Sequence, residues 1–235
     1  MSALFAYDGA IIESYPSVHA GVIHGTGLDN GPSSTELLSE FKAEQRVAIA
    51  RLNEAAIADL PSIAAWRRAF VQFGAKPTQH RNAAEALLRR LVKVGDIPTI
   101  NALVDMGNLV SVRYGMPVAI FDQAHIADST IVRFATGEER FVDIESTDSV
   151  APQPGEVIFV DCDNIVMARR WCWRQSAASA TSQDTVEALV VIEGLHETAR
   201  EDVESAVADL TMLFASHQRG SLTESCLLSA TKTSC

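Results

Sequence analysis

The hydrophobic period of the chain changes at about residue 117. Before this point, apolar residues recur at helical spacing within segments that are bounded by N-cap residues, Gly or Pro, which predicts helices. From residue 118 to about 160, short runs rich in Val, Ile and Phe are separated by polar, Gly or Pro turns, which predicts strands. The chain therefore suits an α+β fold in which several helices pack with a mixed or antiparallel sheet.

The pattern also predicts where each element lies. The expected helices cover residues 33–59, 63–74, 83–94, 98–112 and 197–216. For residues 98–112 the alternative is a helix that runs into a strand. The expected strands cover residues 18–25, 118–121, 131–134, 140–143, 157–160, 166–168, 171–173 and 188–192. We expect one domain over residues 1–217, with residues 10–74 packed on the remainder. Polar and small residues predict a flexible C-terminal tail over residues 218–235.

Charge and cysteine spacing limit the function classes. The 30 acidic and 19 basic side chains give a net charge of −11, which repels a phosphate backbone at long range unless basic groups are concentrated in one place. This charge counts against unselective nucleic-acid binding and against DNA as a partner. The four cysteines form no CxxC pair and match neither a zinc site nor a disulfide framework, so we expect reduced thiols.

The sequence lacks the common targeting and cofactor signals. The N-terminus has no basic region with an apolar run of signal length, and no later stretch approaches the ~20 apolar residues of a membrane span. A cytoplasmic protein without a membrane partner is therefore expected. The motifs GxGxxG, GxxxxGK[ST], HExxH and GxSxG do not occur. We expect no metal and no cofactor.

A family signature occupies residues 101–122. Residues 101–111 read NALVDMGNLVS, and residues 115–122 read GMPVAIFD. They resemble the B3/B4 domain of the bacterial phenylalanyl-tRNA synthetase β subunit, where these stretches read approximately N-x-x-V-D-x-(T/S)-N-Y-V and G-Q-P-x-H-A-F-D. Further matches in the same order extend the resemblance over about residues 75–195. The resemblance implies a stand-alone B3/B4-like fold and, for function, the checking and hydrolysis of wrongly charged tRNA, not a complete phenylalanine-tRNA ligase.

The polar residues of the signature also suit a structural role. Asp105 and Asn108 lie three residues apart and share one face of a helix. From that face they can bind backbone amides of the turn at residues 115–117. Asp122 follows an apolar strand, where a carboxylate commonly caps the next turn.

Several pocket residues of the family are replaced in this chain. The resemblance aligns Ala119 with the family's pocket histidine and Gly107 with its pocket threonine. The pocket glutamate aligns with Val191, and Glu193 lies two residues further on the same face of the expected strand. Glu193 can substitute only if the ligand sits further along or the alignment shifts. Hydroxyl-selective editing of tyrosine is therefore not expected, and Gly107, Asn108, Ala119 and Glu193 become candidate substrate-binding residues.

Residues 169–175 read RRWCWRQ, a local excess of arginine and tryptophan. Stand-alone members of the family carry a similar block where the synthetase has a glycine-rich loop. A strand here places Trp171 and Trp173 on one face and Arg170 and Arg174 on the other. Such a surface can stack an aromatic ligand or base and neutralise a carboxylate or phosphate. The alternative is two core tryptophans with arginines in surface ion pairs.

A second basic segment lies in an expected loop. Lys76, His80 and Arg81 precede the helix at 83–94, where they can contact a tRNA 3′ end or a small anion. A solvated loop is the alternative. No residue is assigned as catalytic, since Cys172, the one candidate nucleophile in the arginine and tryptophan block, has no histidine near it in sequence.

Three functions from different classes fit these features. The first is a trans-acting deacylase of mischarged aminoacyl-tRNA, in which an ordered water attacks the ester. The second is a binding module without catalysis for an amino acid or a small aromatic carboxylate. The third is a scaffold or regulatory domain that kept the fold alone.

Overall fold

The computed structural model describes residues 3–52 and 56–235, and it has the α+β architecture that the sequence predicts. Its helices are α1 (Gly9–Ser14), α2 (Thr35–Leu52), α3 (Pro61–Gln72), α4 (Ala83–Val94), α5 (Ala102–Tyr114) and α6 (Ala199–His217). Its strands are β1 (Phe5–Tyr7), β2 (His19–Thr26), β3 (Val118–Asp122), β4 (Thr130–Phe134), β5 (Phe141–Val142), β6 (Ser149–Val150), β7 (Val157–Val160), β8 (Val166–Arg169), β9 (Arg174–Gln175), β10 (Glu187–Gly194) and β11 (Leu222–Leu228). Short 3-10 helices cover Ile57–Asp59, Gln123–His125 and Ala177–Ser179.

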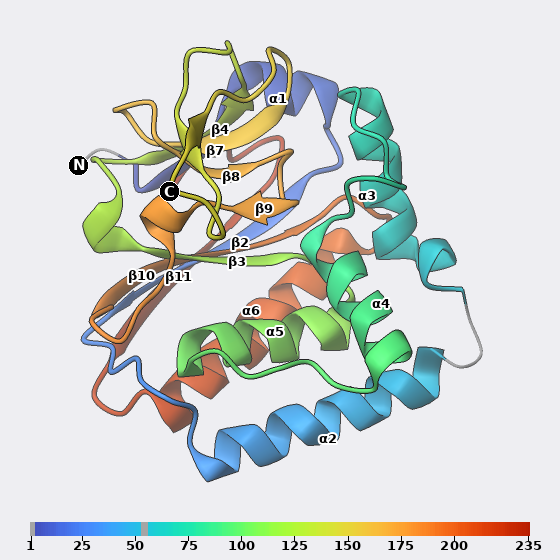
Figure 1. Cartoon of the computed structure of the whole chain (residues 1–235), viewed down its shortest axis with the longest axis vertical. Helices are drawn as coiled ribbons and strands as arrows, with labels where there is room; N and C mark the ends of the chain where they lie inside the picture. Colours follow the sequence, from blue (N-terminus) through green and yellow to red (C-terminus); the bar gives the residue numbers. More distant parts are fainter. Residues whose placement is uncertain (1–2, 53–55) are drawn as a thin grey trace.

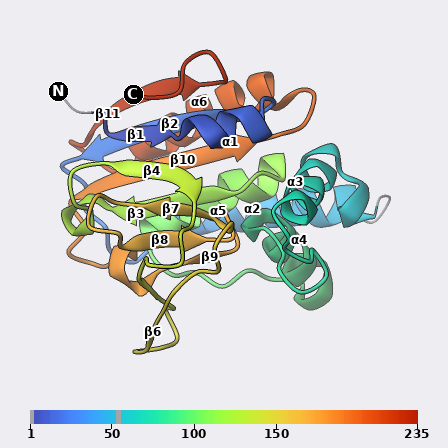
Figure 2. The ribbon, with the colours of Figure 1, turned by 90° about the horizontal axis from the view of Figure 1, so that it is seen from above.

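The strands form two main sheets that lie in adjacent layers. One sheet has the order β1-β4-β7-β8-β9 and is mixed, because β1 pairs with β4 in parallel. The other has the order β11-β2-β10-β3 with antiparallel neighbours, and β5 and β6 form a separate pair. Figures 1 and 2 show α2, α5 and α6 on one side of the four-stranded sheet and the five-stranded sheet on the other. The four-stranded sheet is thus covered on both faces.

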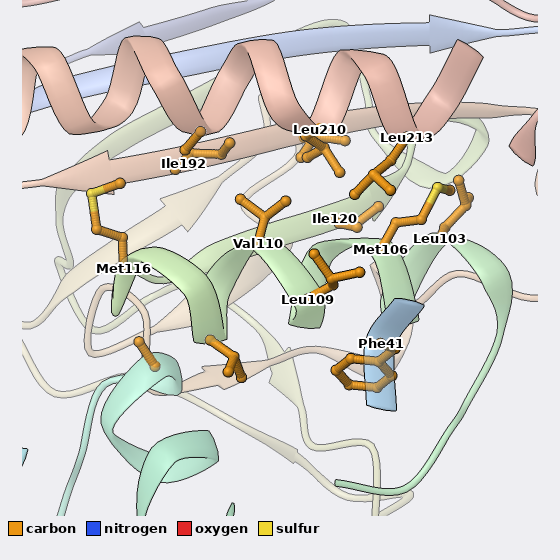
Figure 3. Close-up of a cluster of buried hydrophobic side chains, with 14 of the residues drawn as sticks. Phe41, Leu103, Met106, Leu109, Val110, Met116, Ile120, Ile192, Leu210 and Leu213 are labelled. Atoms are coloured by element: carbon orange, nitrogen blue, oxygen red, sulfur yellow. The ribbon is translucent and has the colours of Figure 1, made fainter. Parts of the chain in front are cut away.

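The helical layer packs on one face of the four-stranded sheet through aliphatic side chains. Helix α5 contacts α2, α6 and β3, and α6 contacts β2 and β10. Figure 3 shows the buried residues at this junction, which are Phe41, Leu103, Met106, Leu109, Val110, Met116, Ile120, Ile192, Leu210 and Leu213. Since full burial of one such side chain stabilises the fold by roughly 1.5–3 kcal/mol, this layer fixes where α5 lies against the sheet.

The opposite face of the four-stranded sheet encloses a second core with the five-stranded sheet. Along β10, Val190 and Ile192 belong to the helical layer, whereas Leu189 and Val191 belong to the second core. This alternation follows from the two-residue period of a strand. It explains why residues 188–192 are apolar throughout, and it sets which face of β10 the following residue Glu193 shares.

Two asparagines begin the helices that carry candidate site residues. Asn82 Oδ1 accepts a hydrogen bond from Glu85 N at the start of α4, as its sequence position predicts. Asn101 Oδ1 accepts one from Val104 N at the start of α5. α5 ends at Gly115, whose φ of 64° is the left-handed conformation that glycine adopts at little cost. These caps fix the first turns of two helices that contribute residues to the site described below.

Two element predictions are wrong at their boundaries or type. The first long helix ends at Leu52 and not near residue 59, and its expected course over residues 53–55 lies outside the described residues. Residues 171–173, expected as a strand, form a turn between β8 and β9 instead. The turn follows from the left-handed backbone of Arg170 and Trp171, which have φ values of 44° and 60°.

The C-terminal segment, expected as a flexible tail, is ordered in the structure. β11 pairs with β2 along seven residues. Beyond it, Cys235 exchanges backbone hydrogen bonds with Phe5 of β1, so the segment joins the edges of both sheets. A disulfide links Cys226 to Cys235, which corrects the expectation of reduced thiols for this pair, while Cys162 and Cys172 are free. Edge-strand pairing and burial of Leu228 supply the order that its polar composition hides.

No helix in the described part of the chain is both long and apolar enough to cross a membrane.

Candidate functional site

Two adjoining cavities lie where α4, α5, β3, β10 and the β8–β9 turn meet. The small cavity has a volume of about 60 Å³ and the large cavity one of about 370 Å³. Both are lined by the same four residues, Ala83, Val118, Trp173 and Gln175. We call the two cavities together the cleft. Among the sequence-predicted residues it is lined by Gly107, Asn108, Ala119, Trp173, Arg174 and Glu193.

Strand pairing places Glu193 in the small cavity. Val191 is the partner of Ala119 across the β10–β3 ladder, and both residues line the small cavity. Glu193 is two positions further along β10, on the same face, and its backbone N–H donates to the carbonyl of Pro117 at 3.4 Å. Val191, which aligns with the family's pocket glutamate, and Glu193 therefore lie on the same wall of the small cavity.

The carboxyl group of Glu193 is buried and hydrogen-bonded from one side. The hydroxyl of Tyr7 and Nε1 of Trp171, at 2.9 Å, both donate to Oε1. Burial raises the pKa of Glu193 from 4.5 to about 7, although the hydrogen bonds from Tyr7 and Trp171 act to lower it. Both donors bind Oε1, and among the described residues none donates to Oε2, so Oε2 is available to a ligand in the small cavity that Glu193 lines. A carboxyl group in this state exchanges a proton near neutral pH.

The turn between β8 and β9 sends the two tryptophans of the block in different directions. Trp171 is fully buried and packs edge-on against Tyr15 and Trp66, with ring centroids 4.9 and 5.0 Å away. Trp173 is partly exposed and lines both cavities. The expectation of both rings on one strand face is wrong, because the left-handed turn replaces the strand. Trp171 supports the floor of the cleft and Trp173 forms part of its rim.

The arginines of the block are paired with carboxylates. Arg170 lies 3.2 Å from Glu156, and Arg174 Nη1 lies 2.9 Å from each carboxylate oxygen of Asp143. Both guanidinium groups also lie over the ring of Trp173, at 4.6 and 5.2 Å from its centroid. Ion pairs of the kind that the structural alternative expects therefore exist, one largely buried at Arg170 and one at the surface at Arg174, and both arginines lie against the partly exposed indole of Trp173.

The large cavity adds polar groups from α4 and α5. Arg90 and Asn108 line it, and within residues 3–52 and 56–235 Arg90 forms no ion pair. Gly107 belongs to its wall because a methyl group there would approach Ile120 Cδ1 to 2.7 Å. The small side chain at this position thus keeps α5 close to β3 and leaves the cavity open.

The polar residues of the signature act on other partners than expected. Asp105 is fully buried and accepts hydrogen bonds from Ser33 Oγ at 2.6 Å and Ile100 N at 2.9 Å. It therefore fixes the entry to α5, not the turn at residues 115–117, whose Met116 carbonyl instead accepts a hydrogen bond from Ser111 Oγ. Burial raises the pKa of Asp105, although its hydrogen bonds act to lower it.

Asp122 behaves as its sequence position predicts. Its carboxylate caps the following 3-10 helix by accepting from Ala124 N at 3.1 Å, and it also accepts from Thr185 Oγ1 at 2.7 Å. Asp122 is therefore structural and lies outside the residues that line the cleft.

The loop residues Lys76, His80 and Arg81 are split by the structure. Lys76 and His80 line a third depression of about 350 Å³ together with Arg170. Arg81 instead points to Glu85, at 4.0 Å, a buried carboxylate that also binds Arg67 and Arg89. The loop therefore contributes to a neighbouring surface and not to the cleft itself.

The sequence-based candidates did not include Tyr7, which donates to Glu193, or Gln175, which lines both cavities, whereas Cys172 was considered as a nucleophile. Tyr7 comes from β1, a three-residue strand with no periodic signal. Gln175 ends the arginine and tryptophan block, and its Nε2 donates to the Ile120 carbonyl at 2.7 Å. Cys172 lines the small cavity, where burial raises the pKa of its thiol well above the usual value, so it is a poor nucleophile.

The cleft can hold a small organic ligand with a polar end. Its floor offers one carboxyl group that titrates near neutral pH, its rim offers an indole ring, and Arg90 offers a positive charge at the wide end. In the described residues no group of three or more His, Cys, Asp or Glu side chains is arranged to hold a metal ion.

Comparisons with known proteins relate the chain to phenylalanine-tRNA ligase. The β subunit of that ligase from Shewanella oneidensis is 31% identical over 88 residues, which make up 37% of this chain and 11% of the subunit. This chain therefore spans a small part of that relative. The crystal structure of an N-terminal fragment of the phenylalanyl-tRNA synthetase β subunit from Pyrococcus horikoshii aligns with a TM-score of 0.47 and 12% identity, over 95% of this chain and 50% of that one.

A family profile gives the broader match. The profile described as the B3/4 domain matches residues 65–215, a span that holds α4, α5, β3, β10 and both cavities of the cleft. The resemblance of residues 75–195 is thereby confirmed, and the chain belongs to the B3/4 domain family.

Proposed function

We propose that the chain binds the aminoacylated 3′ end of a tRNA in the cleft and hydrolyses the ester of a wrongly attached amino acid. The observation that carries the proposal is the Glu193 carboxyl group at the floor of a cleft in a B3/4 domain, with no donor to Oε2 among the described residues. The amino acid lies in the small cavity and the terminal nucleoside in the large one.

The size and walls of the small cavity favour a small amino acid. A water needs roughly 10–15 Å³ by this measure of cavity volume, so about 60 Å³ accommodates only a short side chain. Its walls are largely apolar, with Ala119, Phe121 and Val191 facing the space. The proposed substrate is thus a tRNA that carries a small amino acid, and not one that carries tyrosine.

The chemistry requires activation of a water. A general base works best when its pKa is close to the working pH, because it is then partly ionised and still basic. Glu193 has a pKa of about 7 and lines the small cavity. In the proposed reaction Oε2 accepts the proton of the water that attacks the ester carbonyl.

A panel of tRNAs, each charged with a different amino acid, tests the proposal by release of the amino acid. We expect release from at least one pair, and a loss of about 10²-fold or more in Glu193→Gln. Glu187→Gln is the matched control, since Glu187 lies on the same strand and pairs with His24, away from the cleft. No release from any pair by the wild type would refute the hydrolytic function, and equal release by wild type and Glu193→Gln would refute Glu193 as its general base.

A second function, amino-acid binding without turnover, is favoured by one observation. The groups beside Glu193 are fixed by structural contacts, with Trp171 in the core and Cys172 held as a thiol. Calorimetry with free small amino acids distinguishes the two functions. Saturable binding that Glu193→Gln weakens, together with no release of amino acid from any charged tRNA, would support the binding module.

A further inference from the structure

The third depression, which we call the basic hollow, lies on the other side of Trp173 from the cleft. It has a volume of about 350 Å³ and is formed by residues 73–80, the loop at 153–156 and Arg170. The groups that bear on a ligand are Lys76, Gln79, His80 and Arg170, with Glu156 as the one carboxylate among the lining residues. None of these groups has a role in the hydrolysis proposed above.

The basic hollow carries a positive surplus in an acidic chain. Arg169 binds Glu156 through two contacts, Nε to Oε2 at 3.1 Å and Nη2 to Oε1 at 2.7 Å, which matches one carboxylate with one guanidinium. Arg170 and Lys76 then remain in excess of Glu156. Lys76 is exposed and forms no ion pair within the described residues. With a net charge of −11 for the whole chain, this local surplus favours an anion.

The backbone pays a cost to bring Arg170 to this place. Arg170 and Trp171 have φ values of 44° and 60°, a left-handed backbone that is strained for residues other than glycine. The turn buries Trp171 and directs Arg170 into the basic hollow, where its guanidinium lies 4.6 Å from the centroid of the Trp173 ring. The strained turn thus sets an arginine and an indole side by side at the surface.

Two residues that line the basic hollow, His80 and Arg170, contact Trp173 of the cleft. The His80 ring, which lines the basic hollow, contacts that of Trp173 edge-on with centroids 4.7 Å apart, and Trp173 lines both cavities of the cleft. His80 Nδ1 is buried without a hydrogen-bond partner in the described residues. A ligand that occupies both places therefore carries an anionic group in the basic hollow and a second group in the cleft, with Trp173 next to both.

We propose that the basic hollow binds a backbone phosphate of the RNA end whose terminal nucleoside lies in the cleft. Lys76 supplies a mobile charge, and the guanidinium of Arg170 supplies planar donors that suit phosphate oxygens. This assignment rests on the proposed function, because it takes the terminal nucleoside to lie beside Trp173. The phosphate chemistry alone also fits a free nucleotide, so the test includes one.

The test uses the full chain and an RNA hairpin that has a single-stranded CCA 3′ end and carries no amino acid. Neutralising one phosphate contact lowers the slope of log K against log salt by about 0.7 for a single strand, so Lys76→Gln is expected to weaken binding several-fold and to reduce the slope by that amount. Arg170→Gln should act in the same direction. Lys93→Gln, an exposed change of equal charge in the last turn of α4, is expected to leave the slope unchanged.

Each result decides the assignment. No RNA binding by the wild type, or equal effects of Lys76→Gln and Lys93→Gln, overturns it. Adenosine monophosphate that binds through Lys76, with no Lys76 effect on the RNA, also overturns it and assigns the basic hollow to a free nucleotide. The RNA hairpin carries no amino acid, so its binding does not depend on hydrolysis. A Lys76 effect on RNA binding therefore supports the phosphate site even where no aminoacylated tRNA is hydrolysed, and the two proposals can fail separately.

Discussion

Trp171 and Trp173 are two residues apart in the same block and serve different regions of the molecule. Trp171 is fully buried between Tyr15 and Trp66 and donates to Glu193, so it belongs to the floor of the cleft. Trp173 is partly exposed, with Arg170 and His80 against its ring, so it belongs to the rim. The left-handed turn at Arg170 and Trp171, and not the alternation of side chains along a strand, therefore decides which ring of this block is buried and which lines the cleft.

Truncating the two rings should separate floor from rim most strongly. Trp171→Ala removes a fully buried ring and a donor to Glu193, and we expect a loss of about 3–5 kcal/mol in the free energy of unfolding. Trp173→Ala removes two cation–π contacts at the surface and should cost about 1 kcal/mol. Urea unfolding measures both. Similar losses for the two variants would mean that the division into floor and rim is wrong.

The buried carboxyl group of Glu193 should make the free energy of unfolding depend on pH. The pKa of Glu193 is raised from 4.5 to about 7 on folding, so the folded state binds more protons than the unfolded state between these values. The contribution of Glu193 to the free energy of unfolding is fully present below about pH 4.5. It is lost as the pH rises to about 7, by about 3 kcal/mol in total.

Glu193→Gln tests this dependence, because glutamine keeps an acceptor for Tyr7 and Trp171 but does not titrate. We expect the free energy of unfolding of the variant, relative to wild type, to increase from about pH 4.5 to about 7 and then to stay level. The difference cancels the contributions of other carboxylates. A constant difference over that range would show that Glu193 ionises as an ordinary surface glutamate.

Local signals predicted much of the scaffold, and long-range contacts decided the rest. Asn82 caps α4 as expected because a cap depends on its own first turn. Glu193 reaches the same wall as Val191 because a strand has a fixed two-residue period. By contrast, Arg170 and Trp171 adopt left-handed backbone that their residue types disfavour, and burial of Trp171 offsets that cost.

The C-terminal segment was misread for a related reason. The order of β11 depends on β2, which is about 200 residues earlier in the chain, and no local pattern encodes that pairing. Tyr7 reaches Glu193 across a similar separation, from a strand of three residues. Gly107, Asn108, Ala119 and Glu193 were therefore accessible from the family resemblance, whereas Gln175, the left-handed turn before it and the donor from β1 were not.

The turn itself can be tested by comparing two changes at Arg170. Arg170→Ala removes the ion pair with Glu156 and the contact with Trp173 but keeps a side chain at φ 44°. Arg170→Gly removes the same contacts and relieves the left-handed strain. We expect the glycine variant to be more stable than the alanine variant by about 1 kcal/mol in urea unfolding. Equal stabilities would indicate that the turn carries no strain, and the assignment of residues to floor and rim would then need another cause.

The smallest expected effect on stability is at Gly107, on the wall of the large cavity. Alanine there gains up to about 1 kcal/mol of helix propensity in α5, and its methyl group meets Ile120 Cδ1 at 2.7 Å, which the flexible end of that side chain can relieve by moving. We expect a stability change within about 1 kcal/mol but weaker binding of the RNA hairpin, because the methyl group and the displaced Ile120 take space from the large cavity. Gly9→Ala in α1 is the control, since a methyl group there meets no atom within 4 Å and lies outside the cleft. Unchanged RNA affinity in Gly107→Ala would place the nucleoside elsewhere and leave Trp173 as a rim residue without a ligand beside it.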